Sequence, residues 1–86
     1  MRKANEILTH ELKCWPEFFQ AILDGQKTYE IRKNDRDFWI FDRVRLREYD
    51  PQKQYYTGRE KTATIVHITT DFSGIKEGFC VFGIGG

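Results

Sequence analysis

The feature that most constrains this fold is one short apolar stripe beside a proline. Pro16 suits the first helical position, because its missing N–H is unpaired there in any helix. Glu17 favours the positive end of the helix dipole, and Gly25 can take the left-handed conformation that ends a helix. The apolar residues recur at helical spacing: Trp15, Phe18, Phe19, Ile22 and Leu23. The sequence therefore predicts one amphipathic helix from Pro16 to the turn at Gly25, with its stripe buried in the core.

The rest of the chain has the patterns of β-strands. An opening strand over residues 7–13 would place Leu8, His10 and Leu12 on one face. Four later segments are also typical of strands: 27–33, 42–50, about 59–72 and 79–84. One helix among short strands, in 86 residues with room for one core, predicts an α+β fold. We expect a single domain over residues 1–86: a small mixed β-barrel with its one main helix after the first strand, packed at the barrel end.

Two of these strands carry further detail. In the long segment, Ala63 and Ile65 fit one face and Val66 and Ile68 fit the other, as expected where a strand bends around a barrel corner. The segment 79–84 is apolar on both faces, which predicts a central strand covered on both sides.

The charge balance and the cysteines exclude several classes of protein. The formal net charge of +1 leaves neither a strongly basic arm nor an acidic tail. No apolar run approaches the roughly 20 residues of a membrane span, and no signal peptide is evident, so we expect a cytoplasmic protein without membrane contact. Cys14 and Cys80 are expected to be buried structural thiols, since their spacing to His10 and His67 matches no familiar zinc site. We expect no metal and no other cofactor.

The stretch DGQKTYEIRKNDRDF, residues 24–38, puts charged side chains where a strand should bury a face. Thr28, Glu30 and Arg32 share one side of it, with neighbours about 7 Å apart. Glu30 can accept a hydrogen bond from an amino group while Arg32 grips a phosphate or a carbonyl, or the two can form a solvated ion pair. Strict alternation puts Lys27 on the other face, so it joins them only if regular strand geometry begins after it.

The chain resembles the ASCH (activating signal cointegrator homology) superfamily, whose fold is a PUA-like β-barrel, in three segments: HELKCWPEFFQAILDGQKTYEIRKNDRDF, DRVRLREYD and YTGRE. The resemblance runs from His10 to Ile84 and is closest to a small bacterial and phage branch described as a domain of unknown function. Its most specific part is the glycine at the helix end followed by Lys27, Thr28, Glu30 and Arg32.

This resemblance implies a ligand cleft between the helix and the barrel. We therefore expect an RNA- or nucleotide-binding module that is a monomer or a weak dimer, with RNA, a nucleoside or a nucleotide as its partner. The expected ligand contacts are Lys27, Thr28, Glu30, Arg32, Arg36, Arg59 and His10. Arg36 and Arg59 are expected to close the cleft, and His10 is either a secondary contact or a core histidine.

The alternative is a small hydrolase, either an acylcytidine-type amidohydrolase or a ribonuclease, because some members of the superfamily catalyse such reactions. The amidohydrolase pattern uses a lysine, a threonine and a glutamate. The lysine matches Lys27, Glu30 occupies the threonine position, and the glutamate has no clear counterpart. If the chain is an enzyme, Lys27 and Glu30 are the expected catalytic residues, with Glu30 as general base on water. The missing hydroxyl favours binding without catalysis.

Basic and aromatic residues share one face of the 42–50 strand or follow it closely: Arg43, Arg45, Arg47, Tyr49, Tyr55 and Tyr56. Such a row suits contact with single-stranded RNA. It equally suits pairing with acids on a neighbouring strand, such as Glu60. Both interpretations stay open at this point.

The turn before this strand departs from the superfamily. Relatives commonly carry Val-Gly-Asp where this chain has Ile40-Phe41-Asp42. Since a phenylalanine with positive φ would be strained, either the turn has another shape or Phe41 packs or meets a ligand. The apolar run 38–41 is either an exposed stacking platform or, as we expect in a chain with so little core, buried as a whole.

Overall fold

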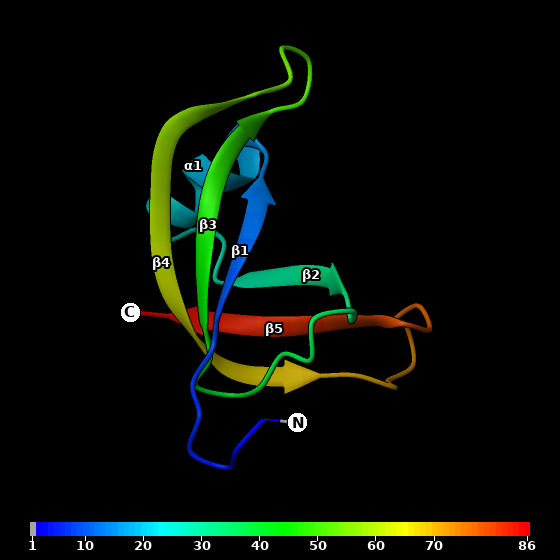
Figure 1. Ribbon diagram of the computed structural model, residues 1–86. Coiled ribbons are helices and arrows are strands. Elements are labelled where there is room, and N and C mark those ends of the chain that lie inside the picture. The colour runs from blue at the N-terminus through cyan, green and yellow to red at the C-terminus, as the bar shows by residue number, and fades with distance from the viewer. Residues whose placement is uncertain (1) are drawn as a thin grey trace.

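A computed structural model describes residues 2–86 as a curled sheet with one short helix (Figure 1). The elements are β1 (Thr9–Cys14), α1 (Pro16–Leu23), β2 (Tyr29–Lys33), β3 (Arg43–Asp50), β4 (Tyr55–Thr69) and β5 (Phe79–Gly85). The strand order is β1-β3-β4-β5-β2, with β1 parallel to β3 and the other pairs antiparallel. The expected mixed sheet with one helix after its first strand is confirmed as a half-barrel. Within residues 2–86, no helix has the length and apolarity that crossing a membrane requires.

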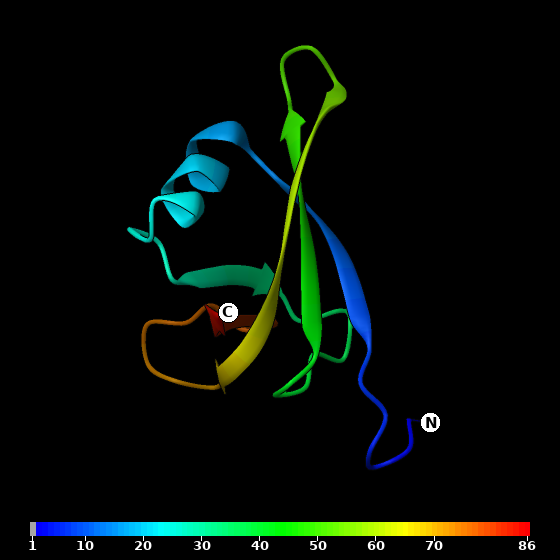
Figure 2. The same cartoon turned by 90° about the vertical axis from the view of Figure 1, so that its left-hand side faces the viewer.

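The curl of the sheet comes from β4, a strand of 15 residues. Its first part pairs with β3 and its second part with β5. Figure 2 shows the second end of this strand curving away from β3. The pairing register shifts between Ile65 and His67, so the predicted bend is confirmed. The strand begins at Tyr55 and ends at Thr69, earlier at both ends than the predicted segment of about 59–72, so only a short turn separates it from β3.

The helix buries only part of its apolar stripe. Phe19 and Ile22 are core residues, and Gly25 ends the helix with a φ of 75°, as predicted. Trp15, Phe18 and Leu23 are each more than 40% exposed, so the prediction that the whole stripe is core is wrong. A helix of eight residues contacts the curled sheet along one narrow line, and the apolar side chains on either side of that line stay exposed to solvent.

The core lies on the concave side of the sheet. It consists of Leu12, Cys14, Phe19, Ile22, Phe38, Val44, Leu46, Ala63, Ile65, Cys80 and Phe82. Leu8 precedes β1 and is exposed, which corrects its expected place on the buried face. In β5 only Cys80 and Phe82 are buried, so this strand is central in the sheet but covered on one face.

The edge strand β1 is joined to the other edge strand, β2, and to the segment after it by side chains instead of a backbone ladder. Arg36 Nη1 donates to the carbonyl oxygen of Glu11 at 2.7 Å, and Arg32 Nη2 donates to that of Lys13 at 2.5 Å. These two guanidinium groups therefore bridge the open seam of the half-barrel and satisfy carbonyls of the β1 edge.

The turn before β3 keeps the positive-φ geometry despite its phenylalanine. Phe41 has a φ of 77°, and its N–H donates to the Ile65 carbonyl at 2.7 Å. Its ring is 67% exposed, so it does not pack in the core. Phe38 alone is buried in the run 38–41, which corrects the expectation that the whole run is buried.

Candidate ligand-binding site

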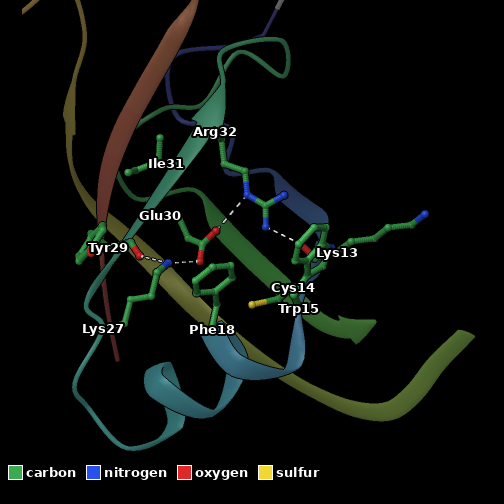
Figure 3. Close-up of a pocket in the computed structure, with 9 residues that line it drawn as sticks. All are labelled: Lys13, Cys14, Trp15, Phe18, Lys27, Tyr29, Glu30, Ile31 and Arg32. Carbon is green, nitrogen blue, oxygen red and sulfur yellow. Dashed lines mark hydrogen bonds and ion pairs between the residues drawn. The ribbon is translucent and has the colours of Figure 1, made fainter. Parts of the chain in front are cut away.

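A pocket of about 370 Å³ lies between α1 and β2 (Figure 3). Its lining comes from the end of β1 and the start of α1, the turn after the helix, and β2: Lys13, Cys14, Trp15, Phe18, Lys27, Tyr29, Glu30, Ile31 and Arg32. This volume lies at the small end of the range of sites for small molecules.

The centre of the pocket is a carboxylate held between two cations. Glu30 is 4% exposed; its Oε1 accepts from Lys27 Nζ at 2.7 Å and its Oε2 from Arg32 Nε at 3.0 Å. Lys27 also donates to the Tyr29 carbonyl at 2.7 Å. Because β2 begins at Tyr29, Lys27 can turn to the same side as Glu30 and Arg32, and Figure 3 shows the three pointing toward one another. The group is therefore an ion pair around a buried carboxylate, with Lys27 and Arg32 partly exposed at the pocket, and its contact with a ligand stays a prediction.

The pocket has a surplus of positive charge and of hydrogen-bond donors. Two cations, Lys27 and Arg32, face the single carboxylate of Glu30, while Lys13 lines the pocket but its side chain extends away from it (Figure 3). Lys27 uses two of its three N–H groups, and Arg32 donates through Nε and Nη2. The remaining N–H of Lys27 and the Nη1 group of Arg32 have no hydrogen-bond acceptor within residues 2–86. These groups can bind an anion or a carbonyl oxygen.

The walls of the pocket are aromatic. The Lys27 ammonium lies 4.9 Å from the centroid of the Tyr29 ring and 5.6 Å from that of Phe18. Trp15 and Phe18 are 49% and 46% exposed, so their rings are open to a ligand. Flat rings beside a cationic centre suit a ligand with a planar apolar part and a negative group.

Cys14 lies in the pocket wall but is not an activated thiol. Burial raises its pKa from 9.0 to about 11, and the Glu30 carboxylate adds to this shift. Only a thiolate is a good nucleophile, so Cys14 is a packing residue at neutral pH.

Alkylation of Cys14 is therefore expected to be slow in the folded protein. A pKa raised by about two units lowers the thiolate fraction about a hundredfold, and burial slows access further. Mass spectrometry of iodoacetamide-treated protein at neutral pH measures this rate, with urea-unfolded protein as the control. Equal rates in the folded and unfolded protein would contradict the assignment.

The other predicted contacts lie outside this pocket. Thr28 lines a second hollow of about 250 Å³, also lined by Lys27, and its carbonyl accepts from the Ile84 N–H at 2.9 Å. Arg59 donates to Gln20 Oε1 at 3.0 Å and lies over the Phe19 ring, while Arg36 bridges the seam. The structure thus brings together Lys27, Glu30 and Arg32, and any ligand contact by the others stays a prediction.

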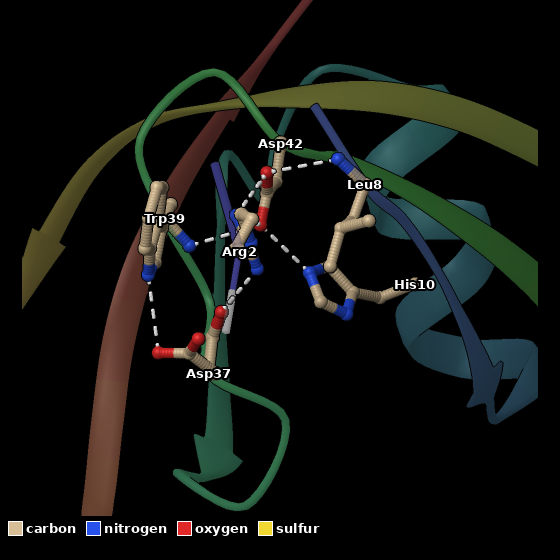
Figure 4. A network of polar contacts seen from close by, with 6 residues as sticks. All are labelled: Arg2, Leu8, His10, Asp37, Trp39 and Asp42. Carbon is tan, nitrogen blue, oxygen red and sulfur yellow. Dashed lines mark hydrogen bonds and ion pairs between the residues drawn. The ribbon is translucent and has the colours of Figure 1, made fainter. Parts of the chain in front are cut away.

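His10 belongs to a separate buried network (Figure 4). Its Nε2 lies 2.8 Å from Asp42 Oδ2, and Asp42, 1% exposed, also accepts from Arg2 Nη1 at 2.7 and 2.8 Å. The N–H groups of Trp39 and Leu8 donate to the same carboxylate at 3.0 and 3.2 Å. Burial alone would raise the pKa of Asp42, but the hydrogen bonds from His10, Trp39, Leu8 and Arg2 outweigh it and hold this pKa below its usual 3.8. His10 is a core histidine in this structure, and it does not line the pocket.

The row of arginines on β3 is largely neutralised. Arg45 contacts Glu60 at 2.8 Å and Glu11 at 3.1 Å, and Arg47 contacts Glu11 at 2.7 Å. The predicted pairing with Glu60 is confirmed. The outer face of β3 is therefore not a broad basic surface.

The sequence matches the model of a protein family over residues 9–84, and that family is described as a domain of unknown function, DUF3850. The chain belongs to the DUF3850 family. The DUF3850 chain is also 35% identical over 60 residues to an uncharacterised 12.9 kDa protein in the GpA 3′ region of Escherichia phage P2. That match covers 70% of this chain and 53% of the phage protein, so the aligned part spans about half the length of the relative. The whole pocket lies inside the family match.

Sequence reasoning missed the aromatic walls of the DUF3850 pocket. The helical spacing of Trp15 and Phe18 predicts burial in the core, and the strand pattern indicates no role for Tyr29, yet all three line the pocket. One signal was available: the helix that Pro16 and Gly25 delimit in the sequence is too short to bury five large apolar side chains against a small sheet. Within residues 2–86, no cluster of three or more His, Cys, Asp or Glu has the geometry to hold a metal ion.

Proposed function

We propose that this DUF3850 chain is an RNA- or nucleotide-binding module whose ligand occupies the pocket between α1 and β2. We further propose that the half-barrel is the PUA-like fold of the ASCH superfamily, which the sequence resembles. The observation that supports the binding function best is the pair of cations, Lys27 and Arg32, oriented by the buried Glu30 beside open aromatic rings.

The cations favour a ligand with a phosphate or carbonyl oxygen. Both Glu30 oxygens already accept from a cation, so Glu30 acts mainly as a positioning residue. It fixes the side chains of Lys27 and Arg32 so that their unused N–H groups are preorganised for a ligand. A guanidinium and an ammonium together suit a phosphate group.

The aromatic walls favour a base. Single-stranded RNA and nucleotides are commonly recognised by bases that stack on aromatic side chains. Trp15 and Phe18 offer such faces at the rim of the pocket, next to the cations. We propose a monomer or weak dimer that acts in the cytoplasm.

The second candidate is a hydrolase acting on the same ligand. It is favoured by one observation: Lys27 Nζ lies 2.7 Å from Glu30 Oε1, so a proton donor and a carboxylate base meet in the pocket. Against it, Thr28 lines the other hollow, and this pocket lacks the hydroxyl of the superfamily hydrolases. The experiment below separates binding from catalysis.

An NMR titration of the labelled protein with cytidine, acetylated cytidine, cytidine monophosphate and short RNA tests the proposal. We expect shifts in residues 27–32 and in the Trp15 indole, with the phosphate-bearing ligands binding more tightly than the nucleosides. Lys27→Met should weaken binding about tenfold, the loss of one charge-assisted contact. Lys33→Met is the matched control, because Lys33 is exposed on the opposite face of β2.

The same samples should then be analysed for reaction products. Product that disappears in Lys27→Met would favour the hydrolase over the binding module. If no ligand shifts residues 27–32, the pocket is not a nucleotide site.

A further inference from the structure

We propose that the site continues out of the pocket, over the β1 edge and onto the outer face of β3 and β4. Its ligand is then a short single strand of nucleic acid, and not a lone nucleotide. This inference rests on the proposed function of the pocket and specifies its ligand.

The continuation is a chain of contacts that starts at Lys13. This residue lines the pocket, but its side chain extends away from it (Figure 3). Its Nζ lies 4.2 Å from the centroid of the Tyr49 ring on β3. The Tyr49 and Tyr56 rings are 5.1 Å apart, and the Arg47 guanidinium lies 3.9 Å from the Tyr56 ring. We call Lys13, Tyr49, Tyr56 and Arg47 the outer track.

The strand pairing keeps the outer track in one line. Lys13 lies opposite Arg47 in the β1–β3 pair, and Tyr49 lies opposite Tyr56 in the β3–β4 pair. The track thus crosses three neighbouring strands on one face of the sheet. The backbone ladder fixes the positions from which these side chains extend, with a shift of register in the β3–β4 pair between Arg47 and Tyr49.

The composition of the outer track fits a single strand. Cations that meet phosphates and rings that meet bases are the two parts of sites for single-stranded nucleic acid. The exposed ring of Trp15 lies at the rim, where a strand leaving the pocket would pass, and Tyr56 is also exposed. One base would lie in the pocket and a second would stack on the Tyr56 ring. The sugar-phosphate backbone between them would then pass over Lys13.

The charges limit this contact to a few nucleotides. Lys13 makes no salt bridge among residues 2–86, whereas Arg45 and Arg47 are neutralised by Glu11 and Glu60. The uncompensated charge therefore lies at the rim, next to the pocket. We expect a shallow salt dependence of binding, since few phosphates are neutralised.

The test compares cytidine monophosphate with a short oligonucleotide of matching sequence, as RNA and as DNA, by titration under one salt condition. We expect the oligonucleotide to bind about tenfold more tightly than the mononucleotide, the gain of about one stacked base. Tyr56→Ala should reduce oligonucleotide affinity to the mononucleotide level and leave mononucleotide affinity unchanged. Tyr56→Phe should keep the gain, because it keeps the ring.

The matched control is Tyr55→Ala. Tyr55 is also an exposed tyrosine, but it precedes Tyr56 in β4, so its side chain lies on the other face. Removing it should change neither affinity. A tighter complex with RNA than with DNA would assign recognition of the 2′-hydroxyl, and equal affinity would assign the shared base and phosphate chemistry.

Each of the remaining outcomes rejects the outer track, the pocket function or both. Equal affinity for oligonucleotide and mononucleotide, with no effect of Tyr56→Ala, overturns the outer track and leaves the pocket function in place. Oligonucleotide binding that responds to Tyr56→Ala but not to Lys27→Met supports the outer track and overturns the pocket. No binding of either ligand overturns both.

Discussion

Asp42→Asn is expected to lower the free energy of unfolding by about 3–5 kcal/mol, the loss typical of breaking a buried ion pair from one side. The Arg2 side chain, 3% exposed, would keep its charge without a carboxylate. Asparagine has the same shape, but its amide nitrogen would face groups that donate hydrogen bonds, among them His10 Nε2 and the Trp39 N–H. In a domain stabilised by only about 5–15 kcal/mol, such a loss is severe.

Urea unfolding followed by circular dichroism measures this loss. Asp37→Asn is the matched control, since Asp37 is an exposed neighbour whose carbonyl accepts from Arg2 and whose positive φ asparagine tolerates. We expect the control to stay within about 0.5 kcal/mol of the wild type. A similar small change in Asp42→Asn would mean that the buried network does not stabilise the fold.

The pH dependence of the free energy of unfolding is a second test of the role of Asp42. Its pKa is lower in the folded protein than the usual 3.8, so its stabilisation is complete above that value and is lost as pH falls through the folded pKa. The stability difference between the wild type and Asp42→Asn should therefore be constant near neutral pH and shrink in acid. A difference that grows in acid would contradict the sign of this linkage.

The second large effect is expected for Glu30→Gln, which should lower the free energy of unfolding by about 2 kcal/mol. Glu30 is buried, but Lys27 and Arg32 are partly exposed, so water offsets some of the cost that a fully buried pair would show. Ligand affinity should also fall, because both cations lose the group that orients them. Thermal unfolding and the titration described above measure the two effects.

Glu60→Gln is the control for Glu30→Gln. Glu60 is also held by arginines, Arg45 and Arg47, but on the exposed outer face of the sheet. We expect it to unfold close to the wild-type midpoint and to bind the mononucleotide, which does not reach the outer face, as the wild type does. If Glu30→Gln keeps wild-type stability and affinity, Glu30 is not the positioning residue of the pocket.

Local patterns predicted most of the fold. The helix ends at Gly25 as expected, and the change of apolar phase after Ile65 marks the observed bend. These features depend on neighbouring residues and on backbone preferences that the sequence displays directly. The pocket centre was also within reach, because Glu30 and Arg32 are two positions apart on one strand.

Contacts between distant segments were out of reach. Arg2 and Asp42 are 40 residues apart, and Arg36 reaches Glu11 across 25 residues. Each depends on how the sheet curls and on where a long side chain ends, which periodicity does not specify. The prediction that Trp15 is buried was wrong for a related reason. Helical spacing shows which face of the helix is apolar, but not how much of that face the sheet can cover.

The strand order has a consequence for the time at which the pocket forms. β2 carries Glu30 and Arg32, yet its backbone partner is β5, nearly 50 positions later in the chain. During synthesis from the N-terminus, β2 has no strand to pair with until β5 has emerged, and long-range pairing of this kind is slow. A nascent chain that ends before Phe79 therefore lacks the backbone partner of β2, and under the proposed function ligand binding would report that β5 is in place.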